Sequence, residues 1–152
     1  MSRREQIQMS DEEVLAFLDE QRVVTCATQG PRGWPHLMPL WFLVRDDEIW
    51  AWTYAKSQKV VNLERDPRAT LQVEAGTEYH ELRGVMLECD TVLHRDTPAV
   101  QAFGEELFER YSGGAAADYA EMVAAQAPKR VALQFVERRR ATWDHRKLAG
   151  VY

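Results

Sequence analysis

The chain has 152 residues, of which 45% are hydrophobic and 28% charged, and its formal net charge is −5. These values exclude an intrinsically disordered chain and predict one globular domain over residues 1–152. The longest stretch without Asp, Glu, Lys or Arg is 33–44, too short for a membrane span of about 20 apolar residues. The negative net charge argues against nucleic acid as a partner.

The first predicted element is a helix over residues 10–20. Ser10 and Glu13 match a capping box, and Val14, Phe17 and Leu18 follow at helical spacing. Strands are then predicted where β-branched and aromatic residues gather between turn signals. They cover residues 23–28, 34–44, 49–54, 69–75 and 79–94, and a short helical piece at 57–64 interrupts them.

The last third of the chain begins with two predicted helices. Hydrophobic residues from Val100 to Tyr111 recur on one helical stripe, and a second helix over 115–127 stops at Pro128. Two strands, at 131–136 and 141–145, close the chain. Antiparallel strands with a helical insertion predict a mainly β, α+β fold, which is a small antiparallel barrel with flanking helices.

The segment 34–44 departs from the alternation of a strand with one face in water. Its two faces carry Trp34, His36, Met38, Leu40, Phe42 and Val44 on one side and Pro35, Leu37, Pro39, Trp41 and Leu43 on the other. The strand 49–54 is also apolar on both faces. Because such strands are covered on both faces, a helix, a second subunit or a flat ligand must cover the face outside the barrel. We favour a homodimer interface.

The short helical piece contains a candidate anion site. Lys56, Lys59 and Asn62 are three residues apart and would share a helical face, and Ser57 stands where its hydroxyl can cap the turn. A helix N-terminus with two ammonium groups and a hydroxyl can bind phosphate. The competing interpretation is a solvated lysine pair beside an ordinary N-cap, and spacing alone slightly favours it.

The C-terminal segment is a second basic region. Residues 129–152 contain 7 basic and 2 acidic side chains, a local charge of +5. Such a segment can hold a small anion or form a solvated edge, and the charge alone favours the edge because long charged side chains normally lie on surfaces.

Several kinds of site are not expected. Cys26 and Cys89 lie far apart, and neither they nor the histidines show metal-ligand spacing. No apolar secretory segment follows Met1, so we predict reduced core thiols in a cytoplasmic protein without a metal site. Serine-hydrolase, dinucleotide-binding and P-loop motifs are also missing from the sequence.

The run from Lys56 to Arg68, Lys-Ser-Gln-Lys-Val-Val-Asn-Leu-Glu-Arg-Asp-Pro-Arg, resembles a known phosphate-binding segment. That phosphate-binding segment is typical of the FMN-binding split-barrel superfamily, the pyridoxamine 5′-phosphate oxidase-like proteins. The strand 24–28, the segment 34–37 and Leu82-Arg83-Gly84 are similar to the same family. The closing segment 142–148, Thr-Trp-Asp-His-Arg-Lys-Leu, is most similar to the branch that uses the deazaflavin coenzyme F420, the group B flavin/deazaflavin oxidoreductases. The resemblance covers roughly residues 10–148.

This resemblance implies a six-stranded antiparallel split barrel that works as a homodimer, with two cofactor sites at the interface. Carried over by position, Ser57 and Lys59 would hold the cofactor phosphate, with Lys56 and Asn62 adjacent. The ring system would be framed by His36, Leu37, Met38, Pro39, Leu40, Trp41, Trp52 and Thr53, and approached by the partner subunit's Trp143, His145 and Arg146.

The function that the resemblance implies is an F420-dependent reductase that transfers a hydride to a planar, conjugated small molecule. Two alternatives stay open: an FMN-dependent oxidoreductase of the same fold, and a non-catalytic flavin- or haem-type binding protein. No residue is identified as an obligate acid, and His36 is a weak candidate for protonating the product. The substrate-phosphate residues of true pyridoxamine 5′-phosphate oxidases have no match here, so vitamin B6 synthesis is not expected.

Overall fold

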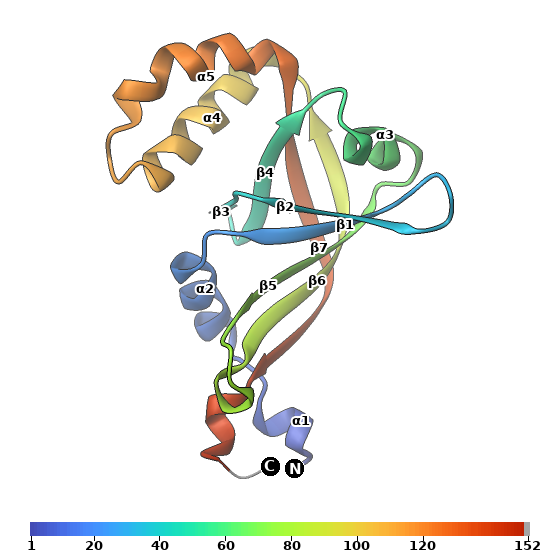
Figure 1. The fold of residues 1–152 in the computed structure, drawn as a ribbon, viewed down its shortest axis with the longest axis vertical. Coiled ribbons are helices and arrows are strands. Elements are labelled where there is room, and N and C mark those ends of the chain that lie inside the picture. Colours follow the sequence, from blue (N-terminus) through green and yellow to red (C-terminus); the bar gives the residue numbers. More distant parts are fainter. Residues whose placement is uncertain (151–152) are drawn as a thin grey trace.

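The computed structural model describes residues 1–150, so the last two residues of the predicted domain lie outside the described part. Within it, seven strands form one antiparallel sheet in the order β2-β1-β5-β6-β7-β4-β3 (Figure 1). The strands are β1 (Val24–Gln29), β2 (Pro35–Leu40), β3 (Leu43–Arg45), β4 (Glu48–Tyr54), β5 (Arg68–Ala75), β6 (Arg83–His94) and β7 (Arg130–Asp144). The predicted mainly β, α+β architecture is confirmed.

The predicted strand 34–44 is instead two strands, β2 and β3. The described residues hold seven strands, whereas the resemblance implied six. β2 pairs with β1, and β3 pairs with β4. Phe42 lies between the two strands and is fully buried. Its backbone bonds to helical side chains instead of a strand: the Phe42 N–H donates to the Tyr111 hydroxyl at 2.9 Å, and the Phe42 carbonyl accepts from Arg110 and Tyr111. Since β2 and β3 are the sheet edges and follow each other in the chain, the sheet curls so that its edges meet here.

The two strands predicted at 131–136 and 141–145 form one strand, β7, of 15 residues. The basic stretch between them continues the pairing with β6, apart from a register shift between Glu88 and Cys89. Arg138 forms an ion pair with Asp90 at 2.6 Å, and Arg139 with Glu88 at 3.0 Å. The neighbouring strand thus supplies the opposite charges that let a run of arginines remain extended.

The predicted helices are present with shifted ends, and α1 is a short helix that was not predicted. They are α1 (Arg3–Gln6), α2 (Asp11–Glu20), α3 (Gln58–Arg65), α4 (Thr97–Tyr111) and α5 (Ala120–Gln126), with 3-10 turns η1 (Tyr79–Glu81), η2 (Ala116–Tyr119), η3 (Ala127–Lys129) and η4 (His145–Leu148). Ser10 caps α2 through the predicted capping box. η1 and η2 replace the predicted start of the strand 79–94 and of the helix 115–127. Within residues 1–150, no helix combines the length and hydrophobicity needed to cross a membrane.

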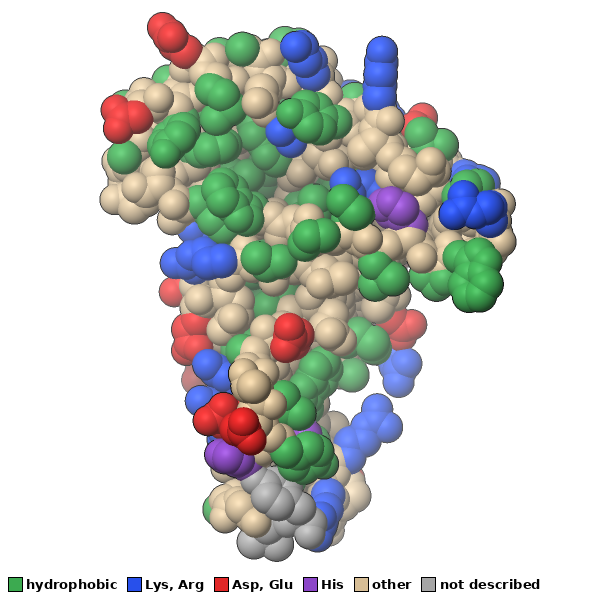
Figure 2. All heavy atoms as spheres, viewed as in Figure 1, with side chains coloured by type: hydrophobic (Ala, Val, Ile, Leu, Met, Phe, Trp, Pro, Cys, Tyr) green, Lys and Arg blue, Asp and Glu red, His purple; other side chains and the backbone are tan. Residues whose placement is uncertain are grey.

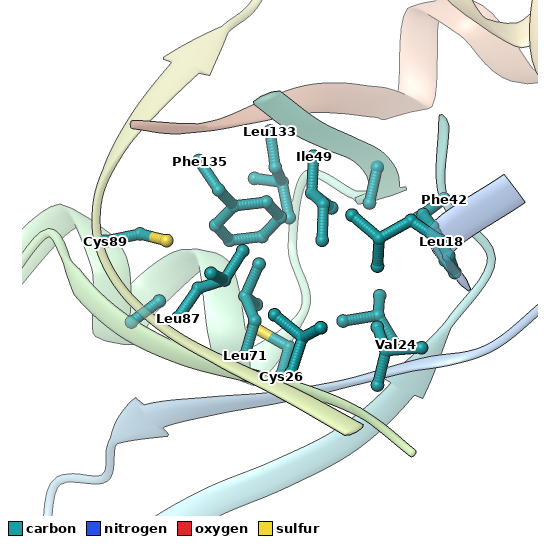
Figure 3. Packing of buried hydrophobic residues seen from close by; sticks show 14 of the residues in the cluster. Leu18, Val24, Cys26, Phe42, Ile49, Leu71, Leu87, Cys89, Leu133 and Phe135 are labelled. Atoms are coloured by element: carbon teal, nitrogen blue, oxygen red, sulfur yellow. The ribbon is translucent and has the colours of Figure 1, made fainter. Parts of the chain in front are cut away.

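The larger of two hydrophobic clusters fills the inside of the barrel (Figure 3). Leu71 and Phe135 there are almost completely buried, and the cluster includes Cys26 and Cys89. Both thiols are free, and burial raises the pKa of each to about 12, so they remain neutral. Their prediction as core thiols is confirmed.

The second cluster lies between the sheet and the pair of helices α4 and α5. Its buried members are Trp52, Val100, Phe103, Leu107, Val123, Ala127 and Ala132. α4 approaches β4 so closely that a Cβ on Gly104 would lie 2.5 Å from the Trp52 ring. A helix of the same chain therefore covers the second apolar face of β4. β2, by contrast, stays largely exposed within the described residues.

Candidate functional site

α3 begins just after β4, on the side of the barrel where the β1–β2 hairpin projects (Figure 1). Ser57 is its N-cap residue, but the Ser57 side chain makes no capping bond to the helix. Its hydroxyl instead makes a long contact, 3.5 Å, with the Thr53 hydroxyl. The first N–H groups of a helix have no intrahelical acceptor and attract anions. Ser57 and the start of α3 thus present hydrogen-bond donors at one place.

Lys59 lies in the first turn of α3 and is only 6% exposed. Its ammonium donates one hydrogen bond, 2.8 Å long, to Thr53 Oγ1, and within residues 1–150 no carboxylate pairs with it. Burial lowers the pKa of Lys59, because the ammonium loses its hydration without gaining a negative partner. An ammonium has three donors. A bound phosphate would therefore supply both the missing charge and the missing acceptors.

The two predicted neighbours of the phosphate take other positions. Lys56 precedes the N-cap residue, so it does not share a helical face with Lys59 as predicted, and its side chain is exposed. Asn62 is completely buried; its amide donates to Thr28 Oγ1 at 3.0 Å and accepts from Gln58 Nε2 at 2.8 Å. Asn62 therefore holds α3 against β1, while Lys56 is available to solvent.

Beside α3, β2 and the turn before it present an uncovered apolar surface (Figure 2). The exposed side chains there include Trp34, Leu37, Met38 and Pro39, whereas Leu40 is partly buried against the core. A cavity of about 230 Å³ lies between this turn and Gln58 at the start of α3.

His36 lines the same cavity. Its Nδ1 atom is buried and has no hydrogen-bond partner in the described part of the chain. Buried polar atoms are rarely left unpaired in native proteins. A flat ring with polar edges and an anionic tail would match these features: the ring the apolar surface, its polar edge the unpaired nitrogen, and the tail the buried ammonium. The residues present therefore fit such a cofactor.

The two tryptophans predicted to frame the ring lie at different depths. Trp41 is 46% exposed at the break between β2 and β3, and its ring stacks on Tyr111 with 4.2 Å between centroids. Trp52 is buried under α4, and its neighbour Thr53 holds Lys59. Trp41 can therefore present a ring face to a ligand, whereas Trp52 supports the site from below.

The structure does not bring Trp143, His145 and Arg146 to this place. Trp143 is near the end of β7, and the other two are in η4, which lies near α1 at the opposite end of the molecule (Figure 1). β7 begins beside α3, where Arg130 pairs with Tyr54. Its 15 residues extend over roughly 45 Å at about 3.3 Å per residue. Within one chain, Trp143 is therefore remote from Lys59.

At that opposite end the polar groups are already paired. Arg146 binds Asp144 through two hydrogen bonds, which lower the pKa of the Asp144 carboxyl. His145 Nδ1 lies 2.8 Å from the carbonyl oxygen of Tyr79. Any contact of these residues with a cofactor would have to be made to the site of another subunit.

Arg130 is a residue of the site that the sequence reasoning missed. It is half-buried at the start of β7, and its guanidinium lies 4.0 Å from the ring centroid of Tyr54 and 4.5 Å from that of Trp52. The sequence did contain a signal. No Asp or Glu occurs in residues 49–63 or 122–136, and these are the two segments that β4 and β7 bring together.

This curled antiparallel sheet with a candidate anion site at the start of one helix defines a split-barrel protein. The model of the family described as pyridoxamine 5′-phosphate oxidase matches residues 10–145. The chain belongs to this family and to its split-barrel superfamily. No match was found among curated proteins.

Solved structures share the whole fold. A conserved hypothetical protein from Mycobacterium tuberculosis is 41% identical, with a TM-score of 0.90 over 100% of this chain and 95% of that chain. A structure named as an F420 reductase is 18% identical, with a TM-score of 0.63 over 83% and 94% of the two chains. A FAD-binding protein from Mesorhizobium loti is 19% identical, with a TM-score of 0.66 over 88% and 94%. At such identities the last two similarities show the fold alone.

Proposed function

We propose that this protein is an oxidoreductase that binds coenzyme F420 and transfers a hydride between the deazaflavin and a planar, conjugated small molecule. The observation that carries the proposal is Lys59, a buried ammonium that has no carboxylate partner among residues 1–150. It lies beside a helix N-terminus and an uncovered apolar surface. The similarity of the segment 142–148 to the F420-dependent branch supports F420 over a flavin. The fold occurs both in a protein named as an F420 reductase and in one named as FAD-binding, so the fold is compatible with either cofactor.

In this proposal the phosphate is held at the start of α3. Ser57 and the first-turn N–H groups donate hydrogen bonds to it, and Lys59 supplies a positive charge that burial keeps unscreened. The exposed Lys56 attracts the anionic tail at longer range. Asn62 acts indirectly, because it fixes α3 at the height where these donors converge.

The ring would lie against the apolar surface of β2. Leu37, Met38, Pro39 and Trp41 exclude water from one ring face without offering protons. His36 lines the adjacent cavity, and a change of its side-chain rotamer would let the unpaired Nδ1 bond to a polar ring atom. The cofactor supplies the hydride chemistry, while the protein places the ring and its substrate. Holding two reactants in this orientation can lower a barrier by about 7–11 kcal/mol. His36 is also the candidate group for protonating the product.

We further propose that residues 1–152 form one cofactor-binding domain per chain and that two chains form a homodimer in the cytoplasm. The uncovered apolar face of β2 supports a subunit interface, because exposed hydrophobic patches of this kind mark interaction sites. In that dimer the partner subunit's Trp143, His145 and Arg146 would complete each site, which explains why one chain keeps them remote from Lys59.

The cofactor assignment is tested by titrating the purified protein with F420 and FMN side by side and then assaying reduction of a panel of conjugated acceptors. We expect quenching of F420 fluorescence at a lower concentration than FMN requires, and hydride transfer to at least one acceptor. A yellow flavin spectrum that survives desalting would instead identify an FMN-dependent enzyme. Binding without any turnover would identify a flavin- or haem-type binding protein.

The shared site is tested by mixing two inactive variants, Lys59→Ala and Trp143→Ala, under conditions that exchange subunits. In a two-fold dimer with shared sites, each hybrid contains one doubly altered site and one intact site, so we expect cofactor binding to reappear on mixing. Sites built within single chains would give no rescue. A wild type that sediments as a monomer would refute the dimer.

A further inference from the structure

Two acid-free segments that are distant in the sequence meet at the start of α3. Tyr54 pairs with Arg130 across β4 and β7, and the Ala55 N–H donates to the Lys129 carbonyl at 2.9 Å. This pairing places the backbone of Lys129 and Arg130 beside the segment that leads into α3, which contains Lys56 and Lys59. Neither segment, 49–63 or 122–136, contains an Asp or Glu. A protein with a net charge of −5 thus gathers four cations in one region.

Arg130 is held in place there without an acidic partner. Its Nε donates to Gln126 Oε1 at 2.8 Å, and its guanidinium lies over the rings of Tyr54 and Trp52. Among residues 1–150 it forms no ion pair with a carboxylate. Burial lowers the pKa of Arg130, and the charge of Arg130 contributes to lowering the pKa of Lys59. Two like charges that repel each other are the arrangement that a bound anion would relieve.

Most arginines elsewhere in this chain are satisfied within the protein. Arg138 and Arg139 pair with carboxylates of β6. Arg110, which is also partly buried, donates to backbone carbonyls, including those of Leu18 and Gln21. Arg130 differs because its partners are the amide oxygen of Gln126 and the side chain of Tyr54, neither of which is a carboxylate. A guanidinium has five donors, so donors remain for an anion.

We propose that Arg130 is a second anion-binding residue of the site, so that an organic phosphate is held by two cations, Lys59 from α3 and Arg130 from β7. This inference rests on the proposed function in one respect, namely that the site binds an organic phosphate. A guanidinium presents a planar fork that matches two phosphate oxygens. The aromatic rings of Tyr54 and Trp52 limit its rotation, and less conformational entropy is then lost on binding. Arg130 would therefore set how strongly the site prefers a phosphorylated ligand over the same ligand without phosphate.

The test compares FMN with riboflavin, and F420 with its chromophore lacking the phosphate and tail. The measured quantity is the ratio of dissociation constants within each pair. We expect Arg130→Gln to reduce this preference by about tenfold to a hundredfold, the range for hydrogen bonds to charged groups. The matched control, Arg138→Gln, removes an exposed arginine of the same strand and should leave the preference within twofold. An unchanged preference in Arg130→Gln would overturn the proposal.

The variant Arg130→Lys distinguishes a loss of folding from the loss of a phosphate contact, because it retains the positive charge but lacks the planar guanidinium. It should restore part of the preference while binding the phosphate-free ligands like the wild type. If neither pair shows a preference in the wild type, inorganic pyrophosphate replaces them. A rise in melting temperature that Arg130→Gln abolishes supports the proposal, and equal shifts in both proteins, or none, refute it. Absence of F420-dependent turnover with an intact phosphate preference would defeat the proposed function alone.

Discussion

The two ends of β7 are both rich in basic side chains but differ in electrostatic state. At the α3 end, residues 129–131, Arg130 is near enough to Lys59 to affect its pKa, and the two paired segments, 49–63 and 122–136, contain no Asp or Glu. At the η4 end, residues 138–147, the five basic side chains are all paired: Arg138 with Asp90, Arg139 with Glu88, Arg140 with Glu137 and Asp11, Arg146 with Asp144 and Lys147 with Glu13. The local charge of +5 therefore does not measure how much positive charge is available to a ligand.

The two ends are alike in packing. Each holds an indole against a glycine: Trp52 against Gly104 of α4 near the α3 end, and Trp143 against Gly84 of β6 at the η4 end. In both places a Cβ would clash with the ring. The chain thus positions an aromatic ring at each end, and within residues 1–150 only the α3 end combines that ring with cations that lack acidic partners.

The largest expected effect comes from removing the buried charge. Lys59→Met should weaken binding of a phosphorylated cofactor by about 1.5–3 kcal/mol. It should also stabilise the ligand-free protein, on the order of 1 kcal/mol, because a desolvated charge is replaced by an apolar chain. Titration and thermal unfolding measure the two effects. Arg138→Met at the η4 end is the control and should do neither; equal affinity of Lys59→Met and wild type would remove Lys59 from the site.

The glycine contacts give the next effect. Gly104→Ala and Gly84→Ala should each cost about 1–3 kcal/mol of stability through overpacking, measured by urea unfolding. Gly84→Ala should cost more, because its Cβ would also lie 2.9 Å from the Val73 carbonyl oxygen, a backbone atom. If Trp143 reaches the partner's site, Gly84→Ala should also weaken cofactor binding. Unaltered binding in a folded Gly84→Ala dimer would assign Trp143 to packing alone.

The two ends should respond to opposite extremes of pH. Burial lowers the pKa of Lys59 below the ordinary 10.5, so its unfolded form binds more protons between the two values and the Lys59 contribution to ligand-free stability rises with pH there. The buried thiols act in the opposite direction above pH 9, because burial raises the pKa of each to about 12. Phosphate binding favours the charged form, and affinity should fall over the same window, by at most tenfold per pH unit for one proton. At the η4 end, the pKa of Asp144 is lowered by Arg146. Stability from that pair is fully present above pH 3.8 and is lost as the pH falls through the lowered value.

These dependences are checked by chemical denaturation and by cofactor titration across pH. Relative to the wild type, Lys59→Met should lack only the alkaline changes that come from Lys59, and Asp144→Asn should lack only the acid change that comes from Asp144. An alkaline fall in affinity that persists in Lys59→Met would assign the titration to another group.

The smallest effect is expected for a surface pair of the η4 end. Arg139→Gln breaks the exposed ion pair with Glu88 and should change stability by about 0.2–1 kcal/mol, with a smaller effect at high salt. Cofactor affinity should not change. A large loss of affinity would show that the charges of this end are more available to a ligand than their pairing indicates.

Part of the site was predictable because its signals are local. Ser57 and Lys59 follow an aromatic strand in a helical turn, and the structure places both at the start of α3. The prediction that Lys56 and Lys59 share a helical face was wrong, because the helix begins two residues later than that spacing assumed. Arg130 could not be assigned from its own surroundings in the sequence, since the Tyr54 ring and Lys59 become its neighbours only when β4 and β7 pair.

Sequence alone was sufficient for α2, for most strands and for the buried thiols, because capping boxes and hydrophobic periodicity act between residues close in the chain. Tertiary contacts settled the rest. Tyr111 and Arg110 of α4 form hydrogen bonds with the backbone of Phe42, and the predicted strand is thereby divided into two. The acidic residues of β6 pair with the arginines of β7 and let that run remain extended. The same distant contacts neutralise one end of β7 and, in the described part of the chain, leave Arg130 at the other end without an acidic partner, because the pairing of charges depends on which strands are neighbours.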